Sequence, residues 1–342
     1  SVASRGLGDV YKRQFIGCSL CVGVSVWCPY SAHSPSHSSH VTRNWTTSAS
    51  TSQHLFRLLV RQGLGLVALA GGVVGVRAGE ITATTGPHGL GSLVNGGTSC
   101  TSGLCAVTGG VTAGSNLFHR FDAFNTSGGQ ITGVSIQNSG ASNVFVGVLS
   151  LTVIDRNVGL TNPGSLTWLS PAGISIQGAG GFTNVTNLTL STATGARIGN
   201  GIFDALNTSA AQASLLNGGS VTGRAGLVND PQSLSGLALT QNGDLILGGG
   251  LLSIEKELLL DAMGGNVLLQ GAGLETTSEG SAIGIYGQTV TQAAGTTVRA
   301  DGASGGGTIS IQAVERFDSA GSISALGLGD QAKGGTIELT AQ

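Results

Sequence analysis

The last hundred residues of the chain repeat one short phrase, and this repetition is the strongest constraint on the fold. Each copy carries apolar residues at alternate positions, with glycine or another small residue beside them. The copies are GDLILGG, GNVLLQG, SAIGIYG, GTISIQA and GTIELTA, which begin at Gly243, Gly265, Ser281, Gly307 and Gly335, at spacings of 22, 16, 26 and 28 residues. Alternation at period two predicts β-strands, and recurrence at this longer period predicts a solenoid.

A solenoid of parallel strands accounts for the pattern because one coil cannot bury its own apolar face. Stacked coils can bury it, with backbones paired at ~4.8 Å and like residues aligned above one another. Most phrases are followed by a second strand and a glycine-rich turn, as in GSISALGLGDQAKGG from Gly321. We therefore predict an all-β fold, a right-handed parallel β-helix with N-terminal capping strands. An antiparallel sandwich of short strands is the alternative.

Composition supports the solenoid and excludes two other classes. Of 342 residues 59 are glycine, while 9% are charged and 4% aromatic. Glycine supplies sharp corners, and a narrow interior takes small aliphatic side chains. Disordered chains carry more charge, and collagen needs far more than six prolines and a three-residue period. The segment Leu251–Met263 fits a helix partly, but strand-like phrases flank it, so strands are predicted there.

The N-terminal 78 residues divide into three parts. Residues 1–14 include DVYKRQ, which resembles a translated sequencing adaptor, so we exclude them as an artefact. Residues 15–53 are a doubtful upstream extension whose CSLC pair, Cys18 and Cys21, has no second pair at zinc-site spacing. Residues 54–78 are a predicted signal peptide, with an apolar core of about 13 residues and cleavage between Ala78 and Gly79. The alternative is a buried helix or strand.

The chain beyond residue 78 is acidic, with eight Lys and Arg against sixteen Asp and Glu. This balance argues against nucleic acid as a partner, because phosphate neutralisation needs a basic surface. Cys100 and Cys105 lie close together in CTSGLC. In an exported protein such a pair indicates a disulfide; two free thiols are the alternative.

No residue set in this part of the chain has the spacing of a catalytic or metal site. The aspartates are scattered, and Asp301 and Asp330 sit in glycine-rich corners, where aspartate usually stabilises a turn. His119 lies in an apolar phrase and is expected to be a packed or capping residue. No GxSxG motif is expected on a strand-to-helix elbow, the context that a serine nucleophile of this type requires. We predict no catalytic residue, metal or cofactor, and no enzymatic activity.

One phrase links the chain to a known family. AGSNLFHRFDAFNTSGG, residues 113–129, resembles the NLFHSF phrase of the filamentous haemagglutinin N-terminal domain, the secretion module of two-partner secretion exoproteins. The matching residues are Asn116, Leu117, Phe118, His119, Phe121 and Phe124. GGTSCTSGLCAVTGG resembles the cysteine pair found upstream of this phrase in many members, and ASNVFVGVLSLTVID, which continues to Asp155 as a long alternating run, resembles the strand segment after it.

A second phrase, LTWLSPAGISIQG, resembles the family segment in which an apolar strand runs into Asn-Pro-Asn-Gly-Ile. Here the turn reads Ser170, Pro171, Ala172, Gly173 and Ile174, and it is the expected transporter-recognition motif. Proline and glycine predict a turn between two strands whatever its role. Both asparagine amides are absent, so recognition is altered if those amides contact the transporter. Residues 162–164, Asn-Pro-Gly, fit the motif less well.

The resemblance implies a secretion module over residues 79–240 and the start of a truncated β-helical repeat passenger over residues 241–342. It implies export through an outer-membrane β-barrel transporter with POTRA domains. The protein would be secreted or held on the cell surface of a Gram-negative-type bacterium, as an adhesin or haemagglutinin. Its ligand on a host or neighbouring cell would bind chain beyond residue 342. The alternatives are a secreted β-helical enzyme that binds or cleaves polysaccharide, and an autotransporter-type structural surface protein.

Overall fold

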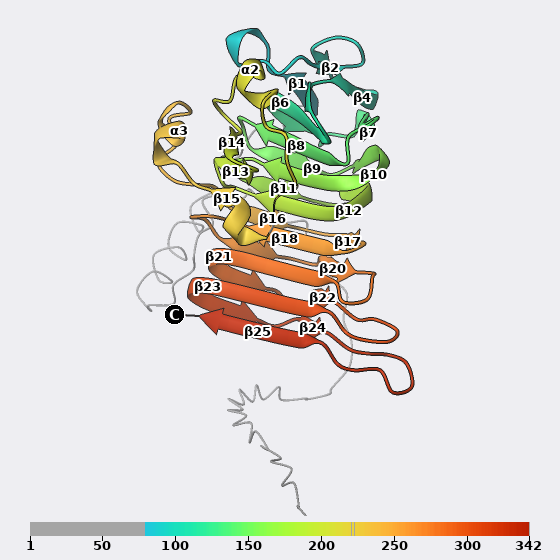
Figure 1. Ribbon diagram of the computed structural model, residues 1–342. Helices are drawn as coiled ribbons and strands as arrows, with labels where there is room; N and C mark the ends of the chain where they lie inside the picture. The colour runs from blue at the N-terminus through green and yellow to red at the C-terminus, as the bar shows by residue number, and fades with distance from the viewer. Residues whose placement is uncertain (1–78, 220, 222, 342) are drawn as a thin grey trace, which may run out of the picture. The chain divides into compact units, whose positions relative to one another are not determined.

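The computed structural model describes residues 79–219, 221 and 223–341. The adaptor-like segment, the extension and the predicted signal peptide, including Ala78, lie outside the described residues. The described part is nearly all β and forms a parallel β-solenoid of about nine turns (Figure 1). This confirms the predicted parallel solenoid.

The first face of the solenoid is a column of parallel strands that runs from the N-terminal coil to the C-terminal coil. Its members are β6 (Asn116–Asn125), β8 (Asn143–Val148), β10 (Asn157–Leu169), β12 (Gly181–Ser191), β18 (Glu257–Asp261), β21 (Ala282–Gln292), β23 (Thr308–Ser319) and β25 (Thr336–Ala341). The repeated phrases at Gly307 and Gly335 pair in parallel, with Thr308 opposite Thr336 and Ala313 opposite Ala341. Neighbouring copies of the repeat therefore lie side by side in the same direction, as the repeat predicts.

Two further columns complete the coils. The second contains β9 (Thr152–Ile154), β11 (Ile174–Ile176), β16 (Leu245–Leu247) and β19 (Val267–Leu269), and the third includes β17 (Leu251–Ile254), β20 (Gly273–Thr276), β22 (Thr297–Arg299) and β24 (Ser322–Ser324). β7 (Ile131–Ile136) pairs with the first part of β10. The Leu251–Met263 segment is two strands, β17 and β18, which confirms the strand prediction.

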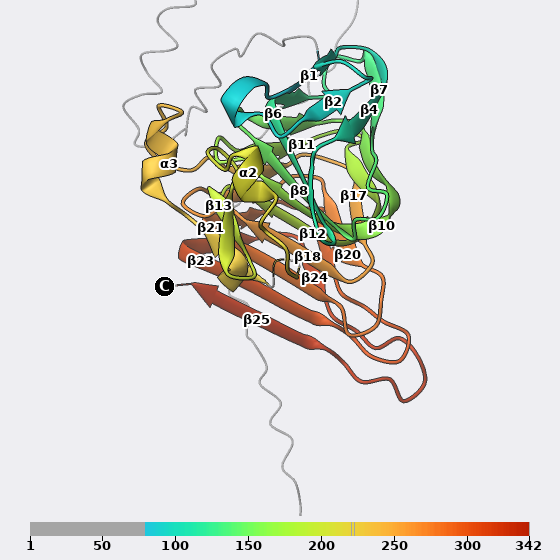
Figure 2. The ribbon, with the colours of Figure 1, turned by 45° about the horizontal axis from the view of Figure 1, so that its top comes forward.

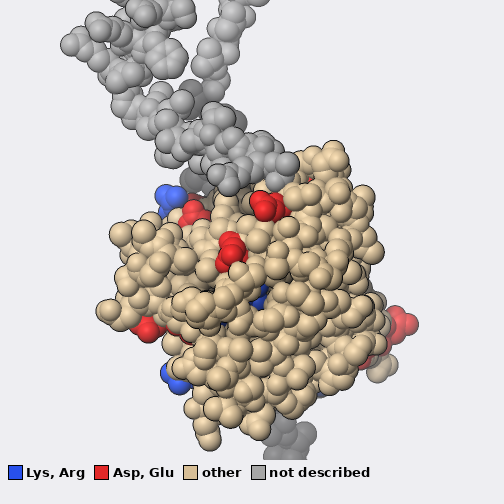
Figure 3. All heavy atoms as spheres, turned by 90° about the horizontal axis from the view of Figure 1, so that it is seen from above, with Lys and Arg blue, Asp and Glu red and all other residues tan. Residues whose placement is uncertain are grey.

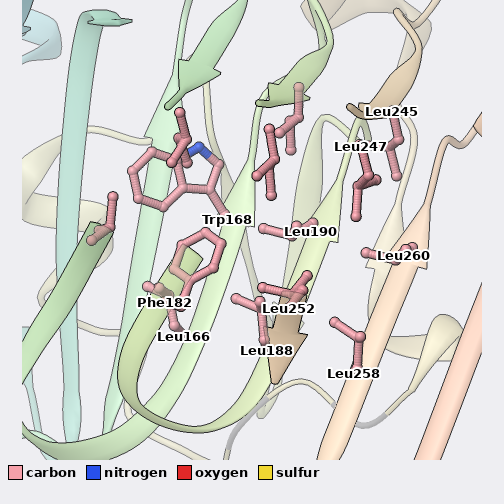
Figure 4. Close-up of a cluster of buried hydrophobic side chains, with 14 of the residues drawn as sticks. Leu166, Trp168, Phe182, Leu188, Leu190, Leu245, Leu247, Leu252, Leu258 and Leu260 are labelled. Carbon is pink, nitrogen blue, oxygen red and sulfur yellow. The ribbon is translucent and has the colours of Figure 1, made fainter. Parts of the chain in front are cut away.

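The inner core is made by stacking like residues along the solenoid. Leu166, Leu188 and Leu258 lie at the same register position of successive strands and are at most 1% exposed (Figure 4). Trp168 and Leu190 occupy the next inward position. Because each side chain packs on its neighbours above and below, the core grows one coil at a time.

The N-terminal end is closed by antiparallel strands (Figure 2). They are β1 (Glu80–Ala83), β2 (Ser92–Val94), β3 (Ser99–Cys100), β4 (Gly103–Gly109) and β5 (Val111–Ala113), with the short 3₁₀ helix η1 (Gly86–His88). β1 and β5 pair antiparallel with β6, and β2 pairs antiparallel with β4. These capping strands occupy hydrogen-bonding groups that an open first coil would leave unpaired.

Residues 192–242 leave the coils between β12 and β16, and we call them the excursion. They form the antiparallel sheet β14 (Gly201–Asp204), β13 (Gly195–Ile198) and β15 (Leu227–Val228), with η2 (Arg224–Gly226), α2 (Ala210–Ala213) and α3 (Pro231–Ser235). This antiparallel sheet is a difference from the parallel coils that the sequence predicts. No helix in the described ranges is long and apolar enough to cross a membrane.

The excursion covers the outer surface of the first coils and creates a second core. The rings of Phe118 on β6, Phe145 on β8 and Phe203 on β14 pack together, with centroids 5.0 Å apart for Phe118 and Phe203. All six residues of β8 are buried as a result. The alternating run over residues 142–155 forms two strands, because β8 is covered on both faces and ends before Leu149, whereas β9 begins at Thr152.

Candidate functional site

The family-like phrase forms β6, the first long strand of the solenoid. Its side chains divide between the two cores, since Phe118 faces the excursion whereas Phe121 and Phe124 belong to the inner core. Phe124 packs edge-on against Trp168 at 4.6 Å, and the Trp168 indole N–H donates to Thr152 Oγ1 over 3.1 Å. The phrase thus joins the cap, the inner core and the excursion.

Arg120, inside that phrase, is the residue that sequence reasoning missed. Its guanidinium is fully buried and donates to three backbone carbonyl oxygens: Ala205 at 2.6 Å, His88 at 2.6 Å and Asp204 at 2.9 Å. Burial lowers the pKa of Arg120 to about 10, although the charges of Asp204 and Asp122 act in the opposite direction. Arg120 therefore remains charged at neutral pH. One side chain therefore ties the N-terminal cap and the excursion to the first coil.

Gly147 of β8 allows the backbone of the excursion to pack closely against the solenoid. It lies opposite Arg120 in the β6–β8 register, and a Cβ placed on it would stand 2.7 Å from the carbonyl oxygen of Ala205. That carbonyl is the one to which Arg120 donates. A side chain at 147 would force the Ala205 backbone away from the solenoid.

Two other members of the phrase make buried polar contacts. Asn116 donates to the carbonyl oxygen of Leu216, 100 residues away in sequence, and accepts from Asn143 on the next coil. His119 Nδ1 lies 3.0 Å from Ser92 Oγ, while Nε2 has no hydrogen-bond partner. Burial lowers the pKa of His119 to about 4, so the imidazole is neutral at pH 7. His119 is a packed residue facing the cap.

The Ser-Pro-Ala-Gly segment is a turn between β10 and β11. The Gly173 N–H donates to the Ser170 carbonyl oxygen over 2.9 Å, and Gly173 has φ of +115°, which favours glycine. The Ser170 hydroxyl is fully buried and lies 2.9 Å from the carbonyl oxygen of Ser150 and 2.8 Å from that of Gly173. The Ser170 side chain therefore stabilises the turn from within. Of the two positions at which the family has asparagine, only Ala172 reaches the surface.

The structure brings the turn close to the family-like phrase. Ile174 pairs with Thr152 on β9, and Thr152 pairs in turn with Phe124 on β6. A single strand therefore separates the two segments that carry the resemblance. Cys100 and Cys105 are joined by a disulfide in the cap, where Cys100 lies opposite Ile81 of β1.

A second connection between the excursion and the solenoid lies at Asp261. The Arg224 Nε donates to Asp261 Oδ2 over 2.9 Å, and the Arg224 guanidinium stacks over Tyr286 at 4.8 Å. Asp261 is fully buried and its Oδ1 has no partner. Burial raises its pKa to about 6, although the charge of Arg224 acts in the opposite direction.

Carboxylates at the corners of the coils have structural partners. Asp155 Oδ1 accepts from Thr126, Asp244 Oδ1 accepts from the Asn266 N–H, and Asp301 Oδ1 accepts from the Leu326 N–H. Within the described residues, no three His, Cys, Asp or Glu side chains lie close enough to hold a metal ion. Figure 3, which looks onto the capped end, shows few charged side chains where the surface is not covered by grey atoms.

The chain has structural neighbours among solved proteins. The chain is similar to a crystal structure described as that of the filamentous hemagglutinin secretion domain, with a TM-score of 0.36 and 13% identity over 76% of this chain and 99% of that chain. No family model matches the sequence, and the search of curated proteins found no match.

Proposed function

We propose that this chain is the leading part of an exported surface protein, passed across an outer membrane by a β-barrel transporter with POTRA domains. The exported protein would be an adhesin or haemagglutinin on the cell surface or in the medium. The observation that carries the proposal is the place of the phrase Asn116–Phe124. It forms the first coil directly under the capping strands, at the end of the solenoid that follows the predicted signal peptide.

The architecture supports export of this kind. Coils that contact mainly their neighbours can fold in succession as a chain emerges, without a finished globular core. The chain is poor in charge, and from the coils after the excursion onward its core is aliphatic. A cap that closes the first coil protects the starting edge from pairing with other chains. Corner carboxylates with backbone partners favour a structural role over a catalytic one.

Transport tests the proposal directly. Residues 79–342, placed behind a standard secretory signal peptide, would be co-expressed with a candidate POTRA-barrel transporter whose established cargo serves as the positive control. We expect folded protein in the medium, and none when the transporter is deleted. Periplasmic retention beside normal export of that transporter's established cargo would overturn the proposal.

The turn offers a second, finer test of the same proposal. The double change Ser170→Asn and Ala172→Asn restores the family's amides. We expect export to be preserved or raised, because the buried contacts of Ser170 can be made by an amide donor and Ala172 is partly exposed. A loss of export with an unchanged unfolding midpoint would show that this turn is not the family motif.

A further inference from the structure

The outer surface of the excursion sheet carries an open cavity of about 690 Å³. Gly195 of β13 lines it, between Val228 of β15 and Asp204 of β14, which lie on either side of Gly195 in register and also line the cavity. Leu215, after α2, and Asp230, before α3, are further lining residues. The volume is in the range of ordinary ligand sites.

The walls of the cavity combine apolar surface with negative charge. Ile202 and Leu215, both on the lining, are 43% and 76% exposed, which leaves apolar surface available to a partner. Ser233, in the first turn of α3, donates its hydroxyl to Asp204 Oδ2 and its backbone N–H to the Asp230 carbonyl oxygen, so both aspartates lie beside this turn. No lysine or arginine is among the described lining residues.

The two carboxylates are held in place by the excursion backbone. Asp204 Oδ1 accepts from the N–H groups of Leu206 and Asn207, and Asp230 Oδ1 accepts from the Gln232 N–H at the start of α3. Both side chains are therefore oriented before any ligand arrives. Two arginines lie nearby: Arg120, which donates to the Asp204 carbonyl oxygen over 2.9 Å and is buried outside the cavity lining, and Arg197, which lies opposite Ile202.

We propose that this cavity binds a basic side chain, lysine or arginine, presented by a partner polypeptide. The aliphatic stem would lie along Ile202, Leu215 and Val228, and its charged end would reach Asp204 and Asp230. Long basic side chains have this form, with an apolar stem and a polar head. A polypeptide is favoured over a free amine because the exposed rim of Ile202 and Leu215 needs a larger partner to cover it. The inference does not depend on the proposed route of export.

The test uses the purified protein with labelled leucine and isoleucine methyl groups, titrated with blocked peptides. The probes are acetyl-Leu-Lys-Leu-amide and acetyl-Leu-Arg-Leu-amide. The control is the first peptide with its lysine side chain acetylated, which removes the positive charge. We expect saturable shifts of the Ile202 and Leu215 methyl signals with the basic peptides. Binding of the acetyl-lysine peptide should be weaker by about threefold or more, as for the loss of a partly exposed ion pair.

Asp230→Asn removes one charge but keeps the helix cap, because asparagine caps as well as aspartate. It should weaken binding by about threefold or more with an unchanged unfolding midpoint. Asp330→Asn makes the same charge change at an exposed position in the C-terminal coil and should leave binding unchanged. The proposal is overturned by unsaturable shifts, by equal binding of the acetyl-lysine peptide, or by equal effects of the two variants. Equal or tighter binding of 1,5-diaminopentane would show that the ligand is a free amine.

Discussion

The Arg120 guanidinium donates to the carbonyl oxygen of Ala205 over 2.6 Å, and so bonds the first coil to a segment 85 residues further along the chain. The same side chain also holds the carbonyl oxygens of His88 and Asp204. The arrangement makes Arg120 the polar centre of the two-layered N-terminal part of the molecule. It predicts that this part is sensitive to single changes that the later coils tolerate.

Arg120→Met keeps the stem and removes all the donors. Three carbonyl oxygens then lose a charged donor, and we expect the free energy of unfolding to fall by about 3–5 kcal/mol. Arg197→Met removes an exposed arginine from the same excursion and should change stability by less than about 0.5 kcal/mol. Denaturant titration of both variants measures the difference. Equal midpoints would show that the three hydrogen bonds contribute nothing net.

Gly147→Ala tests the close approach of the excursion without altering a hydrogen-bonding group. The new Cβ would meet Ala205 O at 2.7 Å and Ala205 Cα at 3.0 Å. We expect faster amide hydrogen exchange within residues 193–234, while the amides of β21 and β23 stay protected, since a solenoid transmits such changes mainly to neighbouring coils. Unchanged exchange in the excursion would contradict this packing.

Phe203→Ala should weaken the outer core selectively. The ring packs against Phe118 and Phe145 and is fully buried, so truncation should cost about 3–5 kcal/mol of local stability. Limited proteolysis should then cut the excursion before it cuts the coils from β18 onward. Simultaneous cleavage of both regions would show that the excursion and the solenoid unfold as one unit.

Two buried groups give opposite pH dependences. The pKa of His119 is lowered from 6.5 to about 4, so its contribution to stability is lost as pH falls from about 6.5 to 4. The pKa of Asp261 is raised from 3.8 to about 6, so the folded state gains stability as pH falls from about 6 to 4. Each shift corresponds to about 3 kcal/mol.

His119→Asn removes the first contribution and Asp261→Asn the second. Relative to the unmodified protein, we expect the His119 variant to become more stable between pH 6.5 and 4, and the Asp261 variant to become less stable over pH 6 to 4. Unfolding midpoints at a series of pH values give both differences. Parallel pH profiles for the three proteins would refute the assignment.

Ser170→Ala tests the buried hydroxyl of the turn. Two carbonyl oxygens, of Ser150 and Gly173, would lose their shared donor, so stability should fall by about 1–2 kcal/mol. Ser165→Ala, on the preceding strand, removes a hydroxyl that accepts only from the Asn187 amide and should cost less. A thermal-unfolding series ranks the two. The reverse order would place the stabilising contact elsewhere in the turn.

The coils from residue 243 onward were predictable because every repeat alternates and most corners contain glycine. Residues 192–242 have no such period, so the excursion could not be foreseen from spacing. A signal was nevertheless present, since Phe118 and Phe145 lie at outward positions of their strands, where a solvent-facing coil would carry polar residues. Arg120 gave no signal of its own, because its partners are backbone carbonyls that only folding brings together.

The sequence also could not predict that the turn lies one strand away from the family-like phrase. The pairing of Phe124 with Thr152, and of Thr152 with Ile174, depends on the exact lengths of two uneven coils. The turn itself was predictable, because proline and glycine fix its backbone locally. A local feature such as this turn can therefore be predicted from the sequence, whereas the pairing register of strands that are distant in sequence cannot.

The 100-residue separation between Asn116 and the Leu216 carbonyl that it holds sets an order of events. A chain synthesised or threaded from its N-terminus cannot complete the first coil until residue 216 has joined it. The first coil would therefore remain incomplete while the coils that contain β8, β10 and β12 form, and the excursion would complete it afterwards. Until the excursion packs against it, the outer face of β6, including Phe118, stays exposed.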